Sequence, residues 1–308
     1  MTIQSEWIAV DWGTSNVRAW GMTNSNEIAF SAQSDQGMSK LTPDQYPDIL
    51  LGLLDGHLAD VNRNIDVVIC GMAGAKQGWM EAPYLETPAN LGELGKKAIA
   101  PVMPSSGLKP RILSGVCQSA NGDEDVMRGE ETQLLGLLDL RPGFSGIVCL
   151  PGTHSKWAKI ENGALKSFTT AMTGELFELL RKHSVLRHSL TDELTGENTD
   201  DGISQGLSES VESPQLLTSK LFKTRAASLL SGRQPDWCAG YLSGLLVGSE
   251  VAGHKNWLSD EPIPLIGSAQ LCSLYTKALG MVGAKTEIID ATKATLAGLS
   301  AARKQIIK

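Results

Sequence analysis

A short stretch near the N-terminus of this 308-residue chain has a counterpart about half a chain further on. Residues 8–20, IAVDWGTSNVRAW, align with residues 148–160, VCLPGTHSKWAKI, so that Gly13-Thr14 matches Gly152-Thr153. In both copies an apolar run leads into a polar Gly-Thr turn, and the residues that follow the turn alternate between the two faces of a strand. This pattern is typical of a β-hairpin. One such hairpin is ordinary, but two at this separation predict a duplication into two similar lobes.

Apolar runs and helical patterns alternate along the rest of the chain, which predicts an α/β protein with largely buried sheets. One helical pattern carries Gly240, Gly244 and Gly248 at every fourth position, and this smooth stripe predicts close helix packing rather than catalysis. The expected domain limits are 1–143 and 144–308. We expect strands over 7–10, 67–70, 111–113, 147–150 and 263–266, helices over 45–61, 130–140 and 236–253, and a polar loop followed by a short helix within 186–214.

The composition excludes several classes of function. The net charge is −7 and no block of Lys or Arg occurs, which argues against a nucleic-acid partner. The five cysteines are far apart and form no CxxC pair, so we expect small core residues in a reducing, cytoplasmic compartment. No segment has the ~20 apolar residues of a membrane span, and no signal pattern is evident. The oligomeric state stays open, with a homodimer as the favoured expectation.

Several motifs, spread over residues 11–248, carry a resemblance to a known family. They are DWGTSNVRAW, CGMAG, GWMEAPY, DVMRGEETQLLG, LPGTHSKW, TAMTGELFELL and YLSGLLVG. In this order they resemble the 2-dehydro-3-deoxygalactonokinase family of the sugar kinase, actin and heat-shock-chaperone ATPase superfamily. The resemblance implies two ribonuclease-H-like lobes, the actin-like ATPase fold, around a nucleotide and sugar cleft. The chain has no GxxxxGK[ST] P-loop, so the nucleotide needs a different cradle.

The activity that the resemblance implies is ATP- and Mg²⁺-dependent phosphorylation of a small-molecule sugar acid. The acceptor would be the primary 6-hydroxyl of 2-dehydro-3-deoxy-D-galactonate, in galactonate catabolism. The sequence leaves open whether the acid derives from galactonate or gluconate. A glucokinase-like or other sugar kinase of the superfamily is the alternative within the class. A nucleotide-dependent switch or chaperone-like ATPase is the alternative from another class.

The nucleotide residues follow from the two hairpins and a C-terminal motif. Asp11 is the expected metal carboxylate, acting on Mg²⁺ through water, although it could simply cap the turn. His154 is expected to donate a hydrogen bond rather than bind a metal, and Lys156 could equally be a surface strand lysine. The adenosine motif PIPLIGSAQLCSLY contributes Gly267 and Ser268, and Gly174 joins them. The expected phosphate-binding residues are Gly13, Thr14, Ser15 and Asn16 from the first hairpin, and Gly152, Thr153, His154, Ser155 and Lys156 from the second.

The catalytic base is expected at the start of the helix over 130–140. A helix N-terminus favours an ionised carboxylate, the form that accepts a proton from a hydroxyl. In related sugar kinases an acidic residue opens the equivalent helix, and this position corresponds to Glu130. Glu131 is the alternative base, and Asp125 is the next candidate if neither glutamate is the base. The substrate carboxylate needs a cation, for which Arg18, Lys76, Arg128 and Arg225 are candidates. The CGMAG segment, with Gly71, Met72 and Ala73, suits close approach of a small ligand, or is only a buried strand-to-loop junction.

Overall fold

The computed structural model describes residues 5–58, 64–104, 106–119, 122–191 and 194–307. The chain divides into two compact units. Unit 1 comprises residues 1–145, 159–168 and 291–308, and unit 2 comprises residues 146–158 and 169–290. The last helix, α8 (Ala291–Ile306), therefore belongs to unit 1, although it lies far beyond the expected limit at residue 143.

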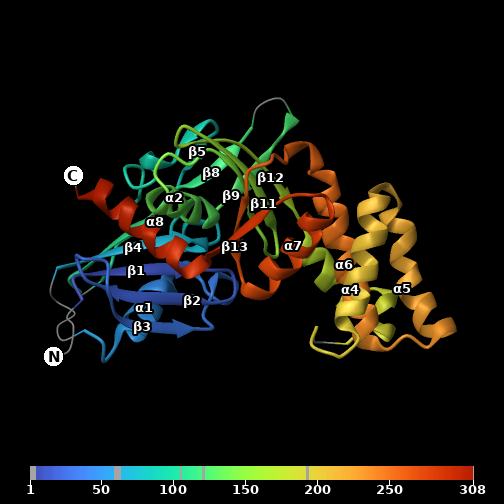
Figure 1. The fold of residues 1–308 in the computed structure, drawn as a ribbon. Coiled ribbons are helices and arrows are strands. Elements are labelled where there is room, and N and C mark those ends of the chain that lie inside the picture. Colours follow the sequence, from blue (N-terminus) through green and yellow to red (C-terminus); the bar gives the residue numbers. More distant parts are fainter. Residues whose placement is uncertain (1–4, 59–63, 105, 120–121, 192–193, 308) are drawn as a thin grey trace. The chain divides into compact units, whose positions relative to one another are not determined.

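The main sheet of unit 1 has the strand order β3-β2-β1-β4-β7 (Figure 1). Strands β1, β2 and β3 form an antiparallel meander, whereas β4 pairs parallel to β1 and β7 pairs parallel to β4. The central strands are buried on both faces, which explains their nearly continuous apolar sequences. The bounds are β1 Trp7–Trp12, β2 Val17–Met22, β3 Ile28–Ser34, β4 Ile65–Gly71 and β7 Leu108–Ile112.

Helices cover both faces of this sheet. Helix α1 (Tyr46–Leu54) packs Leu50 and Leu54 into a core with alternate residues of β1, beginning at Ile8. Helix α2 (Glu130–Leu140) packs against α8, which also contacts β1 and β4. Their crossing needs glycine on both helices, because a Cβ on Gly136 or Gly298 would lie 1.8 or 1.9 Å from a backbone oxygen of the other helix.

A smaller sheet in unit 1 has the order β5-β8-β9, with β5 Tyr84–Glu86, β8 Gly115–Gln118 and β9 Asp125–Met127. Strand β9 leads directly into Gly129 and helix α2. This small sheet therefore sets the position from which α2 starts.

The main sheet of unit 2 repeats the order of the first, as β14-β13-β10-β11-β12. Strand β13 pairs parallel to β10, and β14 pairs parallel to β13. The bounds are β10 Gly146–Leu150, β11 Ser155–Glu161, β12 Ala164–Ala171, β13 Ile263–Gly267 and β14 Thr286–Asp290. The end of β11 (residues 159–161) and the start of β12 (residues 164–168) belong to unit 1. There the start of β12 pairs with β6 (Ala89–Asn90).

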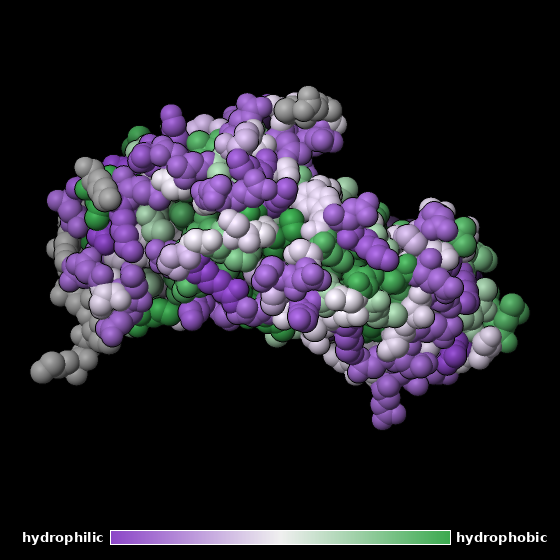
Figure 2. Space-filling model, turned by 45° about the horizontal axis from the view of Figure 1, so that its top comes forward, coloured by the Kyte–Doolittle hydropathy of each residue, from purple (hydrophilic) through white to green (hydrophobic). Residues whose placement is uncertain are grey.

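Five helices complete unit 2: α3 Thr173–His183, α4 Thr199–Glu212, α5 Leu217–Ser231, α6 Pro235–Gly253 and α7 Ala269–Met281. The predicted glycine stripe is confirmed, because a Cβ on Gly240 or Gly244 would lie 2.2 or 2.4 Å from a backbone oxygen of α4. Helix α5 packs on α6 and exposes Phe222, Leu229 and Leu230. The space-filling view shows hydrophobic residues on the surface at its right-hand end, the side on which Figure 1 draws α5 (Figure 2).

The five expected strands are all present, and so are the helices over 130–140 and 236–253. The helix expected over 45–61 is shorter, since α1 ends at Leu54, and residues 59–61 lie outside the described part of the chain. The expected short helix after the polar loop is α4, which packs along α6. All five cysteines are free; four are buried, and Cys117 is half-buried.

Candidate functional site

The loop of the first hairpin, Gly13–Asn16, is held by backbone hydrogen bonds. The N–H of Gly13 donates to the carbonyl of Asn16 at 2.8 Å. From outside the hairpin, the N–H groups of Met38 and Ser39 donate to the carbonyls of Gly13 and Thr14 at 3.0 and 2.9 Å. The side chains of Thr14, Ser15 and Asn16 are exposed. The loop is thus fixed while its tip stays accessible to a ligand.

Asp11 and Arg18 are cross-strand partners at the base of this hairpin. An Arg18 Nη2 atom lies 2.7 Å from Asp11 Oδ2, and the Asp11 side chain is 21% exposed. Arg18 also lies over the ring of Trp20. Because Arg18 already neutralises Asp11, it is a weaker candidate for the substrate carboxylate than its sequence position indicated.

Two glycines bring the ends of β1 and β4 close to the start of α2. Gly71 has φ +87°, and a Cβ there would lie 2.6 Å from the Trp12 carbonyl oxygen and 3.4 Å from Asp11 Oδ1. Gly129 has φ +116°, and a Cβ there would lie 3.5 Å from the Gly71 Cα. Positive φ values of this kind favour glycine. Asp11 and the first turn of α2 therefore meet at one end of the sheet of unit 1.

The two glutamates at the start of α2 differ in environment. Glu130 is half-buried, and its Oε2 accepts a hydrogen bond from the Arg128 N–H at 3.2 Å. Glu131 is only 1% exposed, and it accepts hydrogen bonds from the Gly129 N–H at 2.6 Å and the Thr132 hydroxyl at 3.0 Å. Burial, together with the neighbouring charge of Glu130, raises the pKa of Glu131 to about 7. Glu130 is thus the more accessible carboxylate, and Glu131 holds the turn that precedes the helix.

Arg128 is a buried cation next to these glutamates. Its Nη2 donates to the Ala82 carbonyl at 2.8 Å, and its Cζ lies 4.3 Å from the centre of the Tyr84 ring. Its Nε and Nη1 are buried without a hydrogen-bond partner among the described residues. A buried charge is costly unless an opposite charge or hydrogen bonds compensate it. The open donors of Arg128 therefore point to an anionic ligand group.

The other substrate candidates are placed differently. Ala73 is fully buried in the core of unit 1, so only its backbone could contact a ligand. Met72 is half-buried in the turn after β4, and Lys76 is exposed two residues beyond that turn. Arg225 lies on α5 in unit 2. Asp125 begins β9, and its Oδ1 accepts from the N–H of Val126 at 2.8 Å.

The second hairpin loop presents fewer open side chains than the first. Thr153 and His154 are exposed, and His154 Nε2 hydrogen-bonds the Glu175 carboxylate. Ser155 is fully buried. Lys156 is 5% exposed and donates to the Thr170 hydroxyl at 2.8 Å, so the alternative of a surface strand lysine is wrong.

Helix α3 begins against this loop. A Cβ on Gly174 would lie 2.6 Å from the Gly152 oxygen and 2.7 Å from the Thr153 Cα. The Glu175 N–H donates to the Thr153 carbonyl at 3.0 Å. The loop therefore lies beside the N-terminal end of an eleven-residue helix, a position that favours anions.

Two of the three predicted adenosine residues, Gly267 and Ser268, lie at the junction of β13 and α7, whereas Gly174 lies in the first turn of α3. Ser268 is the N-cap of α7, and its hydroxyl accepts a hydrogen bond from the Leu271 N–H at 3.3 Å. Gly267 is close to the second hairpin, because a Cβ there would lie 2.9 Å from the Pro151 carbonyl oxygen.

A cavity of about 360 Å³ opens beside α7 in unit 2, with Asp200, Ser243, Gln270, Ser273 and Lys277 among its lining. A smaller cavity, of about 80 Å³, shares Ser243, Leu271 and Leu274 with it and reaches Gly152 and Gly174. Sequence reasoning missed this lining. The available signal was the polar spacing of Gln270, Ser273 and Lys277, which places them on one side of α7.

The described residues contain no group of three or more His, Cys, Asp and Glu side chains that could hold a metal ion. A single carboxylate still fits Mg²⁺, because this ion keeps several waters and commonly binds substrate phosphates. Asp11, partly exposed at the first hairpin, is such a carboxylate. Over the described part of the chain, no helix is long and apolar enough to cross a membrane.

The chain matches the model of the 2-keto-3-deoxy-galactonokinase family over residues 11–302. It belongs to this family. The chain is 40% identical over 309 aligned positions to a Rhizobium meliloti (strain 1021) protein named "Probable 2-dehydro-3-deoxygalactonokinase DgoK1", with 99% of each chain covered. It is 32% identical to the 2-dehydro-3-deoxygalactonokinase of Escherichia coli (strain K12), with 96% of each covered. Family membership makes the chain a sugar-kinase-type phosphotransferase.

Solved structures give the same answer for the fold. A crystal structure from Sinorhizobium meliloti that carries the same enzyme name is 39% identical, with a TM-score of 0.87 and 97% of this chain and 99% of that chain covered. Component A of (R)-2-hydroxyglutaryl-CoA dehydratase from Acidaminococcus fermentans is 11% identical, with a TM-score of 0.51 and 98% and 99% covered. The predicted actin-like ATPase fold of the sugar kinases is confirmed.

Proposed function

We propose that this protein is an ATP-dependent kinase that phosphorylates the primary 6-hydroxyl of 2-dehydro-3-deoxy-D-galactonate, in galactonate catabolism. The observation that carries the proposal is the buried Arg128, whose Nε and Nη1 lack a hydrogen-bond partner among the residues that the structure describes, two residues before the half-buried carboxylate of Glu130. A sugar acid needs both a cation for its carboxylate and a base for its hydroxyl. This short segment supplies both.

Glu130 is the base in this proposal. Its position in the first turn of α2 favours the ionised form, which accepts the proton of the attacked hydroxyl. Glu131 positions the turn, because its oxygens are occupied by Gly129 and Thr132. Arg128 binds the substrate carboxylate, and a guanidinium suits that role because it offers several donors in a fixed plane.

The two hairpins bind phosphate groups in the proposal. The exposed Thr14, Ser15 and Asn16 donate from unit 1, and Thr153 and His154 donate from unit 2 beside the start of α3. Asp11 would hold Mg²⁺ through water, and the bound ion would supply neutralisation of charge on the transferred phosphoryl group. The cavities of unit 2 hold the nucleoside, because they lead from Gly152 and Gly174 to polar groups on α7.

A coupled assay of ADP release tests the activity. The panel contains keto-deoxy sugar acids of both stereochemistries, the corresponding neutral sugars, glucose, and no acceptor. We expect release only with a keto-deoxy acid, and fastest with the galactonate-derived one. Equal rates with glucose would favour a glucokinase-like enzyme. ADP release that is independent of any sugar would indicate a switch ATPase instead.

Replacing Arg128 with Lys tests the cation. A lysine keeps the charge but loses the planar set of donors, so we expect the KM for the sugar acid to rise about 10- to 100-fold with little change in the KM for ATP. Arg111→Lys is the matched control, since Arg111 is a half-buried arginine of β7 in the same unit. An unchanged KM for the acid in Arg128→Lys would remove Arg128 from the substrate site.

A further inference from the structure

Helix α6 carries a glutamate in an otherwise apolar turn. Glu250 is 8% exposed and accepts three side-chain hydrogen bonds. Its Oε1 accepts from Trp157 Nε1 at 2.7 Å. Its Oε2 accepts from the Tyr275 hydroxyl at 2.6 Å and from the Thr173 hydroxyl. Burial raises the pKa of Glu250, and the three donors oppose that rise.

The direction of these hydrogen bonds follows from the chemistry of the groups. An indole N–H can only donate, and an ionised carboxylate can only accept. When Tyr275 donates to Glu250, its oxygen is left to accept from the Ser155 hydroxyl, 2.8 Å away. Ser155 Oγ is then available to accept from the Gly152 N–H at 3.3 Å. One ordered chain of donors thus runs from the second hairpin loop to the carboxylate.

A second route joins Glu250 to the same loop. Thr173, which donates to Glu250, is the first residue of α3. The next two residues contact the loop directly, since Gly174 packs on the Gly152 oxygen and the Glu175 N–H donates to the Thr153 carbonyl. Both sides of the loop are therefore tied to one buried carboxylate.

We propose that Glu250 is a positioning residue that fixes the Gly152–Ser155 loop and the start of α3 in the geometry that binds nucleotide phosphate. The inference rests on the proposed function, because it takes this loop as a phosphate-binding element. Glu250 acts through Ser155, Tyr275 and Thr173 and does not contact the nucleotide. Its role is separate from the acid–base chemistry assigned to unit 1.

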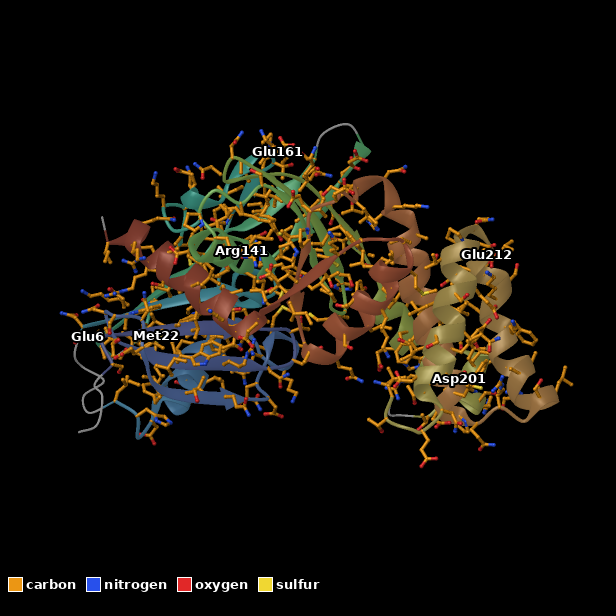
Figure 3. The ribbon with its side chains drawn as sticks, viewed as in Figure 1. Glu6, Met22, Arg141, Glu161, Asp201 and Glu212 are labelled. Atoms are coloured by element: carbon orange, nitrogen blue, oxygen red, sulfur yellow. The ribbon has the colours of Figure 1, made fainter. Side chains whose placement is uncertain are left out.

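The substitution Glu250→Gln tests the role of the carboxylate. The glutamine oxygen can still accept from Trp157, but its NH₂ group donates, so the hydroxyls of Tyr275 and Thr173 must reverse. We expect the Kd for Mg-ADP, measured by calorimetry, and the KM for ATP to rise about tenfold, the loss expected for one hydrogen bond to a charged group. The KM for the sugar acid should stay within twofold. Glu212→Gln is the control, because Glu212 is an exposed glutamate at the end of α4 (Figure 3) and should change neither constant.

Two milder variants keep the test decisive if Glu250→Gln fails to fold. Tyr275→Phe cuts the route through Ser155, and Thr173→Val cuts the route through α3; because both residues also line the smaller cavity, the double variant with Glu250→Gln separates positioning from direct contact with the nucleotide. Each should raise the Kd for Mg-ADP severalfold, with the sugar-acid KM unchanged. In a folded Glu250→Gln background, Tyr275→Phe should add little, because the route is already interrupted.

The outcomes separate this inference from the proposed function. A wild-type protein that binds no Mg-ADP overturns both. A wild-type protein that binds Mg-ADP, with folded Glu250, Tyr275 and Thr173 variants that bind it equally well, overturns the positioning role alone. Variants with a lower Tm but an unchanged Kd would show that the network only stabilises the fold, and that result also overturns the inference.

Discussion

The main sheets of the two units share one strand order but differ in the residues that they place at their hairpins. In unit 1 the order is β3-β2-β1-β4-β7, and in unit 2 it is β14-β13-β10-β11-β12, the same arrangement read from the other edge. Each begins with two neighbouring strands joined by a Gly-Thr turn. The repeat in the sequence is therefore a repeat in topology.

The chemistry at equivalent positions differs. Asp11 and Arg18 form an ion pair in the first hairpin, whereas Leu150 and Trp157 occupy the equivalent positions of the second. Leu150 is buried, and Trp157 donates its N–H to Glu250, a carboxylate from helix α6. At these equivalent positions unit 1 thus has an ion pair, whereas unit 2 has two buried apolar side chains backed by the buried carboxylate of Glu250.

This difference indicates that two units of the same topology can have different functional roles. Unit 1 brings together the partly exposed Asp11 and Glu130 and the buried Arg128, whose Nε and Nη1 have no hydrogen-bond partner among the described residues. Around the second hairpin, unit 2 has the exposed Thr153 and His154, the start of α3 and two cavities. We therefore expect substitutions of Arg128 or Glu130 in unit 1 to change sugar-acid binding or kcat, and substitutions around the second hairpin of unit 2 to change nucleotide binding.

The largest effect is expected for Glu130→Gln. This change keeps the size of the side chain but removes the proton acceptor, so kcat should fall roughly 10²- to 10⁴-fold while the KM for ATP changes little. Steady-state kinetics with both substrates measure this. Glu131→Gln is the companion variant. If it loses the activity and Glu130→Gln keeps it, the base is the neighbouring residue; if both keep it, Asp125 is the next candidate.

Asp11→Asn should have the next largest effect. The amide weakens the hold on Mg²⁺, so we expect kcat to fall roughly 10- to 100-fold and the Mg²⁺ concentration for half-maximal rate to rise. A magnesium titration at saturating ATP measures both. A matched Asp66→Asn variant, in β4 of the same sheet, should leave the magnesium curve unchanged. A slower Asp11→Asn enzyme with a normal magnesium curve would assign Asp11 to the turn alone.

Gly174→Ala tests unit 2 with a smaller effect. Alanine normally stabilises a helix relative to glycine, but here the Cβ would lie 2.6 Å from the Gly152 oxygen, so the hairpin loop must shift. We expect the KM for ATP to rise about tenfold, as for the loss of one or two hydrogen bonds, with the sugar-acid KM unchanged. Gly280→Ala in α7 has open space and is the control. A change in the KM for the sugar acid instead would contradict the expectation that the second hairpin of unit 2 affects nucleotide binding alone.

Local patterns in the sequence were sufficient for much of this fold. Short, nearly continuous apolar runs placed β1 and β4, and the glycine spacing on α6 predicted the close helix packing that α4 provides. The grouping of α8 with unit 1 was missed, because it depends on the contact between α8 and α2, and no local signal reports a contact between segments so far apart. The expectation that the two hairpins bind one polyphosphate stays a prediction.

The sequence predicted which residue types take part in the candidate site, but it did not predict how buried each side chain is or what it contacts. Arg128 was one of four candidate cations, and it is distinguished by its burial and by two donor atoms, Nε and Nη1, that have no hydrogen-bond partner among the described residues. Ser155 looked like an open phosphate donor, but it is buried beneath the loop. Glu250 was overlooked beside the glycine stripe of α6, although a carboxylate in the apolar part of a helix is itself a signal, because burying it requires partners.

The smallest expected effect is a pH dependence of stability from Glu131. Its pKa is raised to about 7 in the folded protein, so between about pH 4.5 and 7 the folded state binds more protons than the unfolded state. The stability contribution of the protonated group is therefore lost as the pH rises through this window.

The variant Glu131→Gln tests this, because glutamine cannot ionise and can keep both hydrogen bonds, accepting from Gly129 and donating to Thr132. We expect the Tm of Glu131→Gln relative to wild type to increase by a few degrees from pH 5 to pH 8, by thermal unfolding. The same comparison with Glu212→Gln should be flat, since Glu212 is exposed. Parallel Tm curves for wild type and Glu131→Gln would mean that Glu131 titrates in its ordinary range, and the assignment of Glu131 as a buried positioning group beside an accessible base would then fail.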